Sequence, residues 1–194
     1  MSETSLSLLD RLQHGPNDTA WQHLVEVYTP LIHGWLRRYA LLDPDVEDLA
    51  QEVLTVVVRK LPEFKKQTQV GSFRRWLRSI TVNCLRDFWR AKRFRLKTTV
   101  KHGFGQILDE LEDPESDLSK RWDKEHDEYV TRHLLEKIRP RFEEKTWEAF
   151  QRVALEGRAV DVVAVELGMS VNAVFIAKSR VVHQLRQEGQ GLLD

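Results

Sequence analysis

Residues 72–95 read SFRRWLRSITVNCLRDFWRAKRFR, and this stretch indicates the fold most clearly. Its large apolar side chains recur at three- and four-residue steps between Trp76 and Trp89. That period places them on one stripe of an α-helix, while the arginines fall largely on the other face. We therefore predict a helix over these residues that has one packed face and one basic face.

The helical period extends through most of the chain on either side of this stretch. Apolar residues repeat at helical spacing over 21–39 and over 49–61, and the acids around Pro44 offer N-cap chemistry before the second run. Nine Gly and six Pro in 194 residues are few for a turn-dense β-sandwich, so we predict an all-α fold. In the last third the expected helices are Tyr129–Ile138, Phe142–Leu155, Val160–Leu167 and Val171–Arg186.

Charge is balanced over the whole chain, with 30 basic and 30 acidic residues, but it is strongly segregated along it. Residues 65–101 hold twelve bases and one acid, a net charge of +11, which is on the scale of a nucleic-acid-binding patch. Residues 109–128 hold ten acids and three bases, a net charge of −7. A third block, Asp43–Glu52, has five acids and no base. A run of like charge is usually a solvated face, but the basic block is too one-sided for solubility alone.

The stretch from Leu96 to about Lys124 shows little periodicity and contains two glycines, a proline and much of the acidic block. It is typical of a linker, with at most a short helical turn. We therefore predict two small helical domains, at residues 1–97 and 125–194, joined by a flexible acidic linker at residues 98–124.

The C-terminal domain contains the pattern of a helix-turn-helix. Counted from Val160, the small residue that the helix crossing needs is Ala164, and the turn glycine is Gly168. Ser170 follows as the N-cap of the second helix. If that helix enters a major groove, these residues face the base edges or phosphates: Ser170, Asn172, Ala173, Phe175, Ile176, Lys178, Ser179, Arg180, His183 and Arg186. Phe175 and Ile176 either contact thymine methyl groups or pack against a partner protein or a neighbouring helix.

Aromatic residues are interleaved with the basic ones in 72–95. Unpaired bases can stack on such rings, as in single-strand-binding proteins. Trp76, Phe88 and Trp89 fall on the apolar stripe, so we predict that they pack in the core. Phe73 and Phe94 lie off the stripe or at its ends and are the better candidates for stacking on bases.

Several classes of function are disfavoured by what the sequence lacks. It has one cysteine, Cys84, which permits no intramolecular disulfide and no thiolate metal cage. There is no glycine-rich phosphate loop, no HExxH and no nucleophile elbow, and the seven histidines lack metal-ligand spacing. We expect no enzyme, no metal and no cofactor. Neither a membrane-length apolar run nor a signal peptide is present, so we expect a cytoplasmic protein without membrane insertion.

Two segments resemble the extracytoplasmic-function (ECF) class of bacterial RNA polymerase sigma factors. Residues 45–54, DVEDLAQEVL, are similar to that family's D-x-E-D-L-x-Q-E-x-F segment. Residues 73–83 are similar to its F-x-x-W-L-x-x-I-x-x-N segment, and Asp87 and Arg90 stand at the expected offsets. The resemblance implies two helical domains, the second a helix-turn-helix. It also implies a non-enzymatic protein that binds core RNA polymerase, directs it to promoters and assists promoter melting.

The same resemblance implies roles for named residues. The helix with Asp45, Asp48, Gln51 and Glu52 would bind the clamp of the largest polymerase subunit. The minus-10 promoter element would be bound by Phe73, Arg75, Arg78, Asn83, Arg86, Asp87, Arg90 and Arg93, with the loop from Lys65 to Ser72 placed to capture an extruded base. The helix-turn-helix would read the minus-35 element. Further implied partners are the polymerase flap and an anti-sigma factor.

The sequence also departs from the family pattern. Family members usually place basic residues early in the recognition helix, whereas residues 174–177 are Val-Phe-Ile-Ala. An alternative is therefore a free-standing helix-turn-helix regulator whose N-terminal helices dimerise or bind a ligand. A third reading is an adaptor in which the basic helix binds an acidic partner. The free-standing regulator would leave the acidic segment Asp45–Glu52 without a role.

Overall fold

The computed structural model describes residues 8–13, 18–39, 42–64, 71–96 and 104–193, and their regular structure is entirely helical. Contacts divide the chain into two units. We call residues 8–130 together with 191–193 the N-terminal unit, and residues 131–190 the C-terminal unit. The division therefore falls within a helix, after Val130. The domain ranges expected from the sequence, 1–97 and 125–194, stay predictions.

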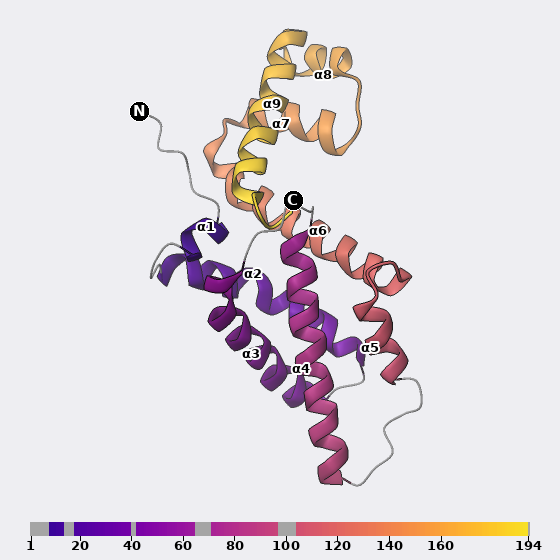
Figure 1. Cartoon of the computed structure of the whole chain (residues 1–194). Coiled ribbons are helices and arrows are strands. Elements are labelled where there is room, and N and C mark those ends of the chain that lie inside the picture. The colour runs from indigo at the N-terminus through magenta and orange to yellow at the C-terminus, as the bar shows by residue number, and fades with distance from the viewer. Residues whose placement is uncertain (1–7, 14–17, 40–41, 65–70, 97–103, 194) are drawn as a thin grey trace. The chain divides into compact units, whose positions relative to one another are not determined.

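The N-terminal unit is built from helices (Figure 1), and it contains many buried apolar side chains. Among its largest fully buried side chains are Tyr28, Leu49, Phe73 and Leu85. The elements are α1 (Leu8–Gln13), α2 (Asp18–Leu36), η1 (Arg37–Tyr39), α3 (Asp43–Lys60), η2 (Leu61–Glu63), α4 (Ser72–Leu96), α5 (Phe104–Glu112) and the first part of α6 (Asp117–Ile138).

Helices α3 and α4 lie where the apolar period predicts them. Helix α4 spans Ser72–Leu96, which confirms the prediction for 72–95. Helix α3 has two acids in its first turn, as expected, but its N-cap is Leu42, without a side-chain cap hydrogen bond. The expectation of an acidic N-cap was therefore wrong, because Asp43 is already inside the helix. The chain after α3 tightens into the 3₁₀ turn η2, whose second residue is Pro62.

The stretch expected to have little regular structure, within residues 98–124, contains helix α5 and the beginning of α6, so that expectation was wrong. Leu108 and Leu111 of α5 are buried at a three-residue step. In α6, Trp122, His126 and Val130 are buried at four-residue steps. This apolar spacing is helical, but single buried residues separated by acids give a weak signal.

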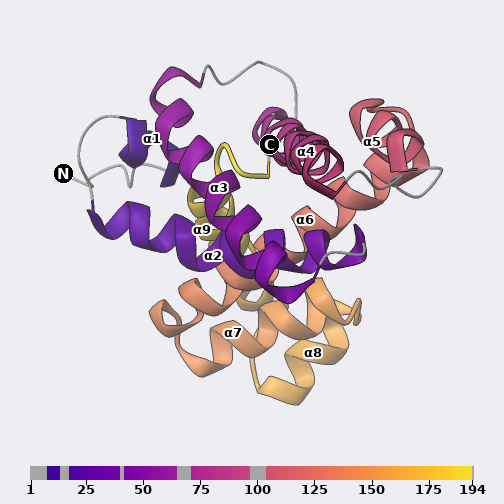
Figure 2. The ribbon, with the colours of Figure 1, turned by 90° about the horizontal axis from the view of Figure 1, so that it is seen from below.

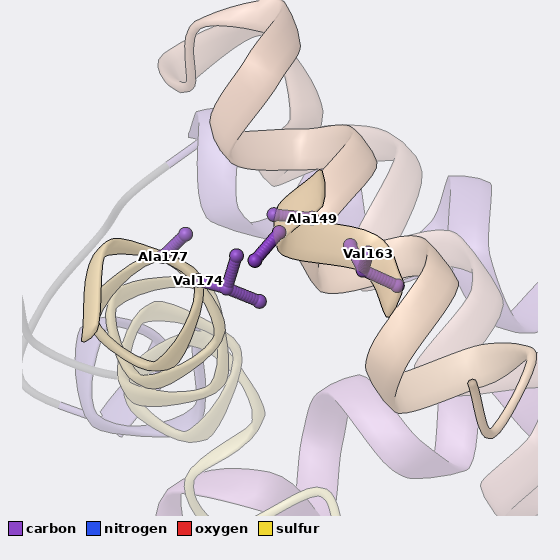
Figure 3. Close-up of a cluster of buried hydrophobic side chains, with 5 residues drawn as sticks. Ala149, Val163, Val174 and Ala177 are labelled. Carbon is purple, nitrogen blue, oxygen red and sulfur yellow. The ribbon is translucent and has the colours of Figure 1, made fainter. Parts of the chain in front are cut away.

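The C-terminal unit contains the rest of α6 and the short helices that follow it. They are η3 (Arg139–Arg141), α7 (Glu144–Phe150), the π-helical turn η4 (Gln151–Leu155), α8 (Val160–Leu167) and α9 (Val171–Gly189). Figure 3 shows side chains of the central cluster, in which Val163 of α8 and Val174 of α9 meet Ala149 of α7. A second cluster, around Trp147, Phe150 and Val181, joins α7 to the middle of α9.

The turn between α8 and α9 has the geometry that the sequence pattern predicts. The two helices meet at 103°, which is within the range of a helix-turn-helix. Gly168 is left-handed, with φ 61° and ψ 41°, and its N–H donates to carbonyls of the last turn of α8. The Ser170 hydroxyl accepts a hydrogen bond from the Ala173 N–H at 3.1 Å. Ala164 is buried at the crossing. The predicted small residue, turn glycine and N-cap are thus confirmed.

No single helix in the described part of the chain is long and apolar enough to cross a membrane, although α8 and α9 taken together pass by length and composition.

Candidate nucleic-acid interface

The first half of the basic face of α4 is engaged inside its own unit. The Arg78 side chain is only 4% exposed and forms an ion pair with Asp123 of α6. It also donates to the Ser119 carbonyl at 3.2 Å. Arg74, one turn earlier, lies 2.7 Å from an oxygen of Asp127 and 3.4 Å from one of Asp123. Buried charges need such partners, so these two arginines hold α6 in place.

A second, more exposed tier follows two turns later on α4. Arg86 donates to Glu112 of α5 at 2.5 Å, and Asp109 lies 3.6 Å from the same guanidinium. The Arg86 side chain is 31% exposed. The hydrogen bond from Arg86 lowers the pKa of Glu112, and the same bond raises the pKa of Arg86. Figures 1 and 2 show α5 alongside α4.

The rest of the predicted minus-10 set is more open to solvent. Asn83 and Asp87 are exposed, and Arg90 is 72% exposed with a 2.9 Å ion pair to Asp87 on its own helix. Arg75 is half-buried. The Arg93 side chain, the Phe94 ring and the loop 65–70 lie outside the described residues. The accessible basic part of α4 is therefore its second half.

The aromatic residues of α4 are distributed differently from the prediction. Phe73 is 1% exposed and packs edge-on to Tyr28 of α2 with ring centroids 5.6 Å apart. The prediction that its ring is available to stack on bases was wrong, because the helix starts at Ser72 and its first turn is already in the core. Trp76, Phe88 and Trp89, expected in the core, are half-buried. Lys92 lies over the rings of the last two, 5.2 and 5.5 Å from their centroids.

Three of the four predicted polymerase-binding residues line one groove between α3 and α4. The groove has a volume of about 580 Å³ and is lined by Asp45, Asp48, Leu49, Glu52, Asp87, Phe88, Ala91 and Lys92. Asp45 forms a 2.6 Å ion pair with Lys92 across it. Asp48 and Glu52 are exposed, and so is Gln51, which is not among the lining residues. The arrangement presents carboxylates on a rigid helix at the surface.

The predicted reading face of α9 is open to solvent. Phe175 is 53% exposed and Ile176 is 49% exposed, so neither is buried against a neighbouring helix. The other five residues of the predicted set lie on the same helix or at its N-cap. Ala173 is half-buried, and the exposed ones are Ser170, Asn172, Ser179 and Arg180. The surface therefore offers a mixed apolar and polar face at the N-terminal half of α9.

Sequence reasoning missed the seam between α6 and the helices α2 and α4. Trp122 of α6 packs on Trp35 of α2 with ring centroids 3.9 Å apart. The buried His126 lies 3.2 Å from the Tyr28 hydroxyl. Burial, and after it the charge of Asp127, raises the pKa of Tyr28 far above its ordinary value. The sequence offered one signal for this seam, which is charge. Residues 65–101 carry a net charge of +11, and residues 109–128, which follow closely, carry −7.

Among the described residues, no group of three or more His, Cys, Asp and Glu side chains is placed to hold a metal ion. The Cys84 thiol is buried within α4, and burial raises its pKa to about 11. A thiol with that pKa is almost fully protonated at neutral pH and is a poor nucleophile.

Comparison with known protein families identifies the helices that carry these groups. Residues 24–95 match the sequence profile of sigma-70 region 2. The matched segment contains most of α2, all of α3 and nearly all of α4, and so includes both the acidic groove and the basic face. The family is that of transcription-initiating sigma factors and is not enzymatic. Helices α5 and α6 and the C-terminal unit lie beyond the region 2 match.

Among solved structures, the chain is similar to the one described as the structure of CnrH in complex with the cytosolic domain of CnrY. The two chains are 21% identical, 92% of each is covered, and the TM-score is 0.38. No curated protein matches the sequence.

Proposed function

We propose that the protein is a sigma factor of the ECF type, which binds core RNA polymerase, directs it to particular promoters and assists promoter melting. The observation that carries the proposal is the match of residues 24–95 to sigma-70 region 2, with an exposed acidic face inside the matched segment. Such a factor acts where RNA polymerase acts, in the cytoplasm.

The polymerase contact is assigned to α3. Asp48, Gln51 and Glu52 are exposed on it, and Asp45 is held at the rim of the same groove by Lys92. Ala50, Val53 and Val57 are buried, so the helix is fixed to its unit by another face. Carboxylates on a rigid, exposed surface complement a basic partner and steer its approach. The proposed partner is the clamp of the largest polymerase subunit.

The minus-10 contact is assigned to the second half of α4. Asn83, Arg86, Asp87 and Arg90 are its described members there, and Arg93 continues the same helix. Arg75 is a further member at the start of the helix. Guanidinium groups neutralise phosphates, and melting follows because contacts to unpaired DNA offset the cost of unstacking. Phe73 and Arg78, placed in this set from the sequence, support the unit from inside instead.

The minus-35 contact is assigned to α9, whose N-terminal half carries the exposed reading face from Ser170 to Arg180. The 103° crossing and the left-handed Gly168 support a helix-turn-helix that can place this helix in a major groove. The resemblance to ECF sigma factors implies two further partners, an anti-sigma factor and the polymerase flap. Phe175 and Ile176 are exposed, so either residue can contact the minus-35 DNA, the anti-sigma factor or the polymerase flap.

The test is a pull-down of the chain with core RNA polymerase, followed by run-off transcription from a cognate promoter. Asp48→Arg reverses an exposed charge on α3, and Glu26→Arg makes the same change at an exposed position on α2. We expect the first variant to lose polymerase binding and transcription while it keeps its helical circular dichroism, and the second to retain both. Tight dimeric binding to a palindrome without polymerase would instead support a free-standing regulator.

A further inference from the structure

Helix α5 covers one of the arginines that α4 is proposed to offer to DNA. Glu112 accepts a 2.5 Å hydrogen bond from Arg86, and Asp109 lies 3.6 Å from the same side chain. A guanidinium binds carboxylate and phosphate with the same donors and in the same fork geometry. A phosphate therefore cannot take its best position on Arg86 while these carboxylates are in place.

We propose that α5 is an intramolecular competitor of DNA, whose carboxylates hold Arg86 in the free protein and are displaced when the phosphate backbone arrives. This inference rests on the proposed function, because it takes Arg86 as a DNA-binding residue. The carboxylates of α5 thereby reduce non-specific binding of nucleic acid. When polymerase positions promoter DNA, a phosphate of that DNA displaces them from Arg86.

The exposure of the ion pairs shows which tier can exchange partners. Arg78 is almost completely buried, and loss of Asp123 would leave its charge unpaired inside the unit. The Arg86 pair is different, because the Glu112 side chain is 44% exposed and that of Asp109 is 77% exposed. Exposed pairs are weak, and a phosphate replaces the carboxylate with a bond of the same kind. A phosphate can therefore displace the ion pairs that α5 makes with Arg86, whereas the ion pair that α6 makes with Arg78 is retained.

The attachment of α5 is suited to undocking as a unit. It has nine residues, too few for a helix to be stable alone in water, so it depends on the burial of Leu108 and Leu111. Its C-terminal end is tied to the start of α6, where the Ser119 hydroxyl donates to the carbonyls of Glu110 and Leu111 at 3.0 and 3.1 Å. Glu112 lies beside this tied end, so its 44% exposed side chain releases Arg86 by rotation, while the rest of α5, with Asp109, can leave α4 without loss of the α6 seam.

Two variants of the full chain should move DNA binding in opposite directions. Glu112→Gln removes the carboxylate that holds Arg86, and Glu110→Gln removes the same charge from an exposed position on the same helix. Gly105→Ala strengthens α5, because a methyl group there meets no atom within 4 Å and alanine favours a helix over glycine. The probe is a fluorescein-labelled single-stranded oligothymidylate at low salt, read by fluorescence anisotropy.

We expect Glu112→Gln to bind the probe about two- to five-fold more tightly than Glu110→Gln, the range given by an exposed ion pair. Gly105→Ala should bind it more weakly than wild type, by up to about five-fold. Equal affinity of the two glutamine variants, unchanged affinity of Gly105→Ala, or no binding by any variant would each overturn the role of α5. Polymerase pull-down by the wild type is read separately, so its failure counts against the proposed function and not against the competitor.

Discussion

Replacement of Asp123 by asparagine tests whether the Arg78 ion pair is a structural element of the N-terminal unit. Asparagine keeps the size of the side chain and an oxygen acceptor but removes the charge. Arg78 is 4% exposed, so its guanidinium would stay buried with only the Ser119 carbonyl and the new amide as acceptors. Arg74 would keep Asp127 at 2.7 Å. The uncompensated charge therefore falls on Arg78 alone.

The magnitude follows from the burial. Removal of one partner of a buried ion pair typically costs about 3–5 kcal/mol, and the retained acceptor reduces this to about 2–4 kcal/mol here. For a unit of this size such a loss lowers the melting temperature by roughly 10 °C. In the double variant Arg78→Met/Asp123→Asn the buried charge is gone as well, so most of the stability should return, to within about 1 kcal/mol of wild type.

The assay is urea and thermal unfolding followed by tryptophan fluorescence, which senses this seam because Trp122 packs on Trp35. Glu128→Gln is the matched control, since it removes an exposed acid of the same helix whose nearest basic atom is 3.8 Å away on Lys124. That variant should lose less than about 0.5 kcal/mol. A loss below about 1 kcal/mol for Asp123→Asn, or a double variant as unstable as the single one, would refute the structural role of the pair.

Three further expectations follow from the ion pairs and caps. Glu188→Gln should destabilise the C-terminal unit by about 1–3 kcal/mol in urea unfolding, because Glu188 is buried and accepts from Arg141 at 2.7 Å. Ser170→Ala should cost about 1 kcal/mol in the same assay by loss of the α9 N-cap, while Ser179→Ala on the exposed face should cost nothing measurable. The pKa of Glu112 is lowered by its hydrogen bond from Arg86, so this contribution to α5 docking is present above the ordinary pKa of about 4.3 and is lost as pH falls through the lower, folded-state pKa. The protection factors of the α5 amides, corrected for the intrinsic pH dependence of exchange, should fall as pH drops below that ordinary pKa, and protection that does not depend on pH there would contradict the assignment.

The sequence was sufficient wherever local chemistry alone determines the backbone. Helix α8 spans Val160–Leu167 as predicted, because Gly168 can take the left-handed conformation at low cost and Ser170 caps the next helix. Helix α4 was equally predictable, since its apolar stripe is long and keeps one period. In both cases each signal lies within a few residues of the structure that it specifies.

Long-range pairing could not be predicted in the same way. Whether Arg78 faces solvent or a carboxylate depends on Asp123, which is 45 residues away, and the helical period alone does not reveal such a partner. Phe73 was misplaced for a related reason. It lies at the end of its stripe, and only the aromatic cluster with Tyr28 and Phe64 shows that the core extends that far. The acidic block reads as a linker in the sequence because it shows little periodicity and lies near two glycines and a proline.

Part of the charge balance of the chain lies in ion pairs between α4 and the helices α5 and α6. A basic helix that is free on all sides would attract any polyanion, and the affinity would carry no sequence information. Acids of α5 and α6 neutralise Arg74, Arg78 and Arg86, so the free unit presents mainly the far end of α4 to solution. Under the proposed function, DNA binding then depends on contacts made elsewhere, to polymerase through α3 and to DNA through α9. Under this arrangement the charge segregation seen in the sequence limits non-specific binding as much as it promotes specific binding.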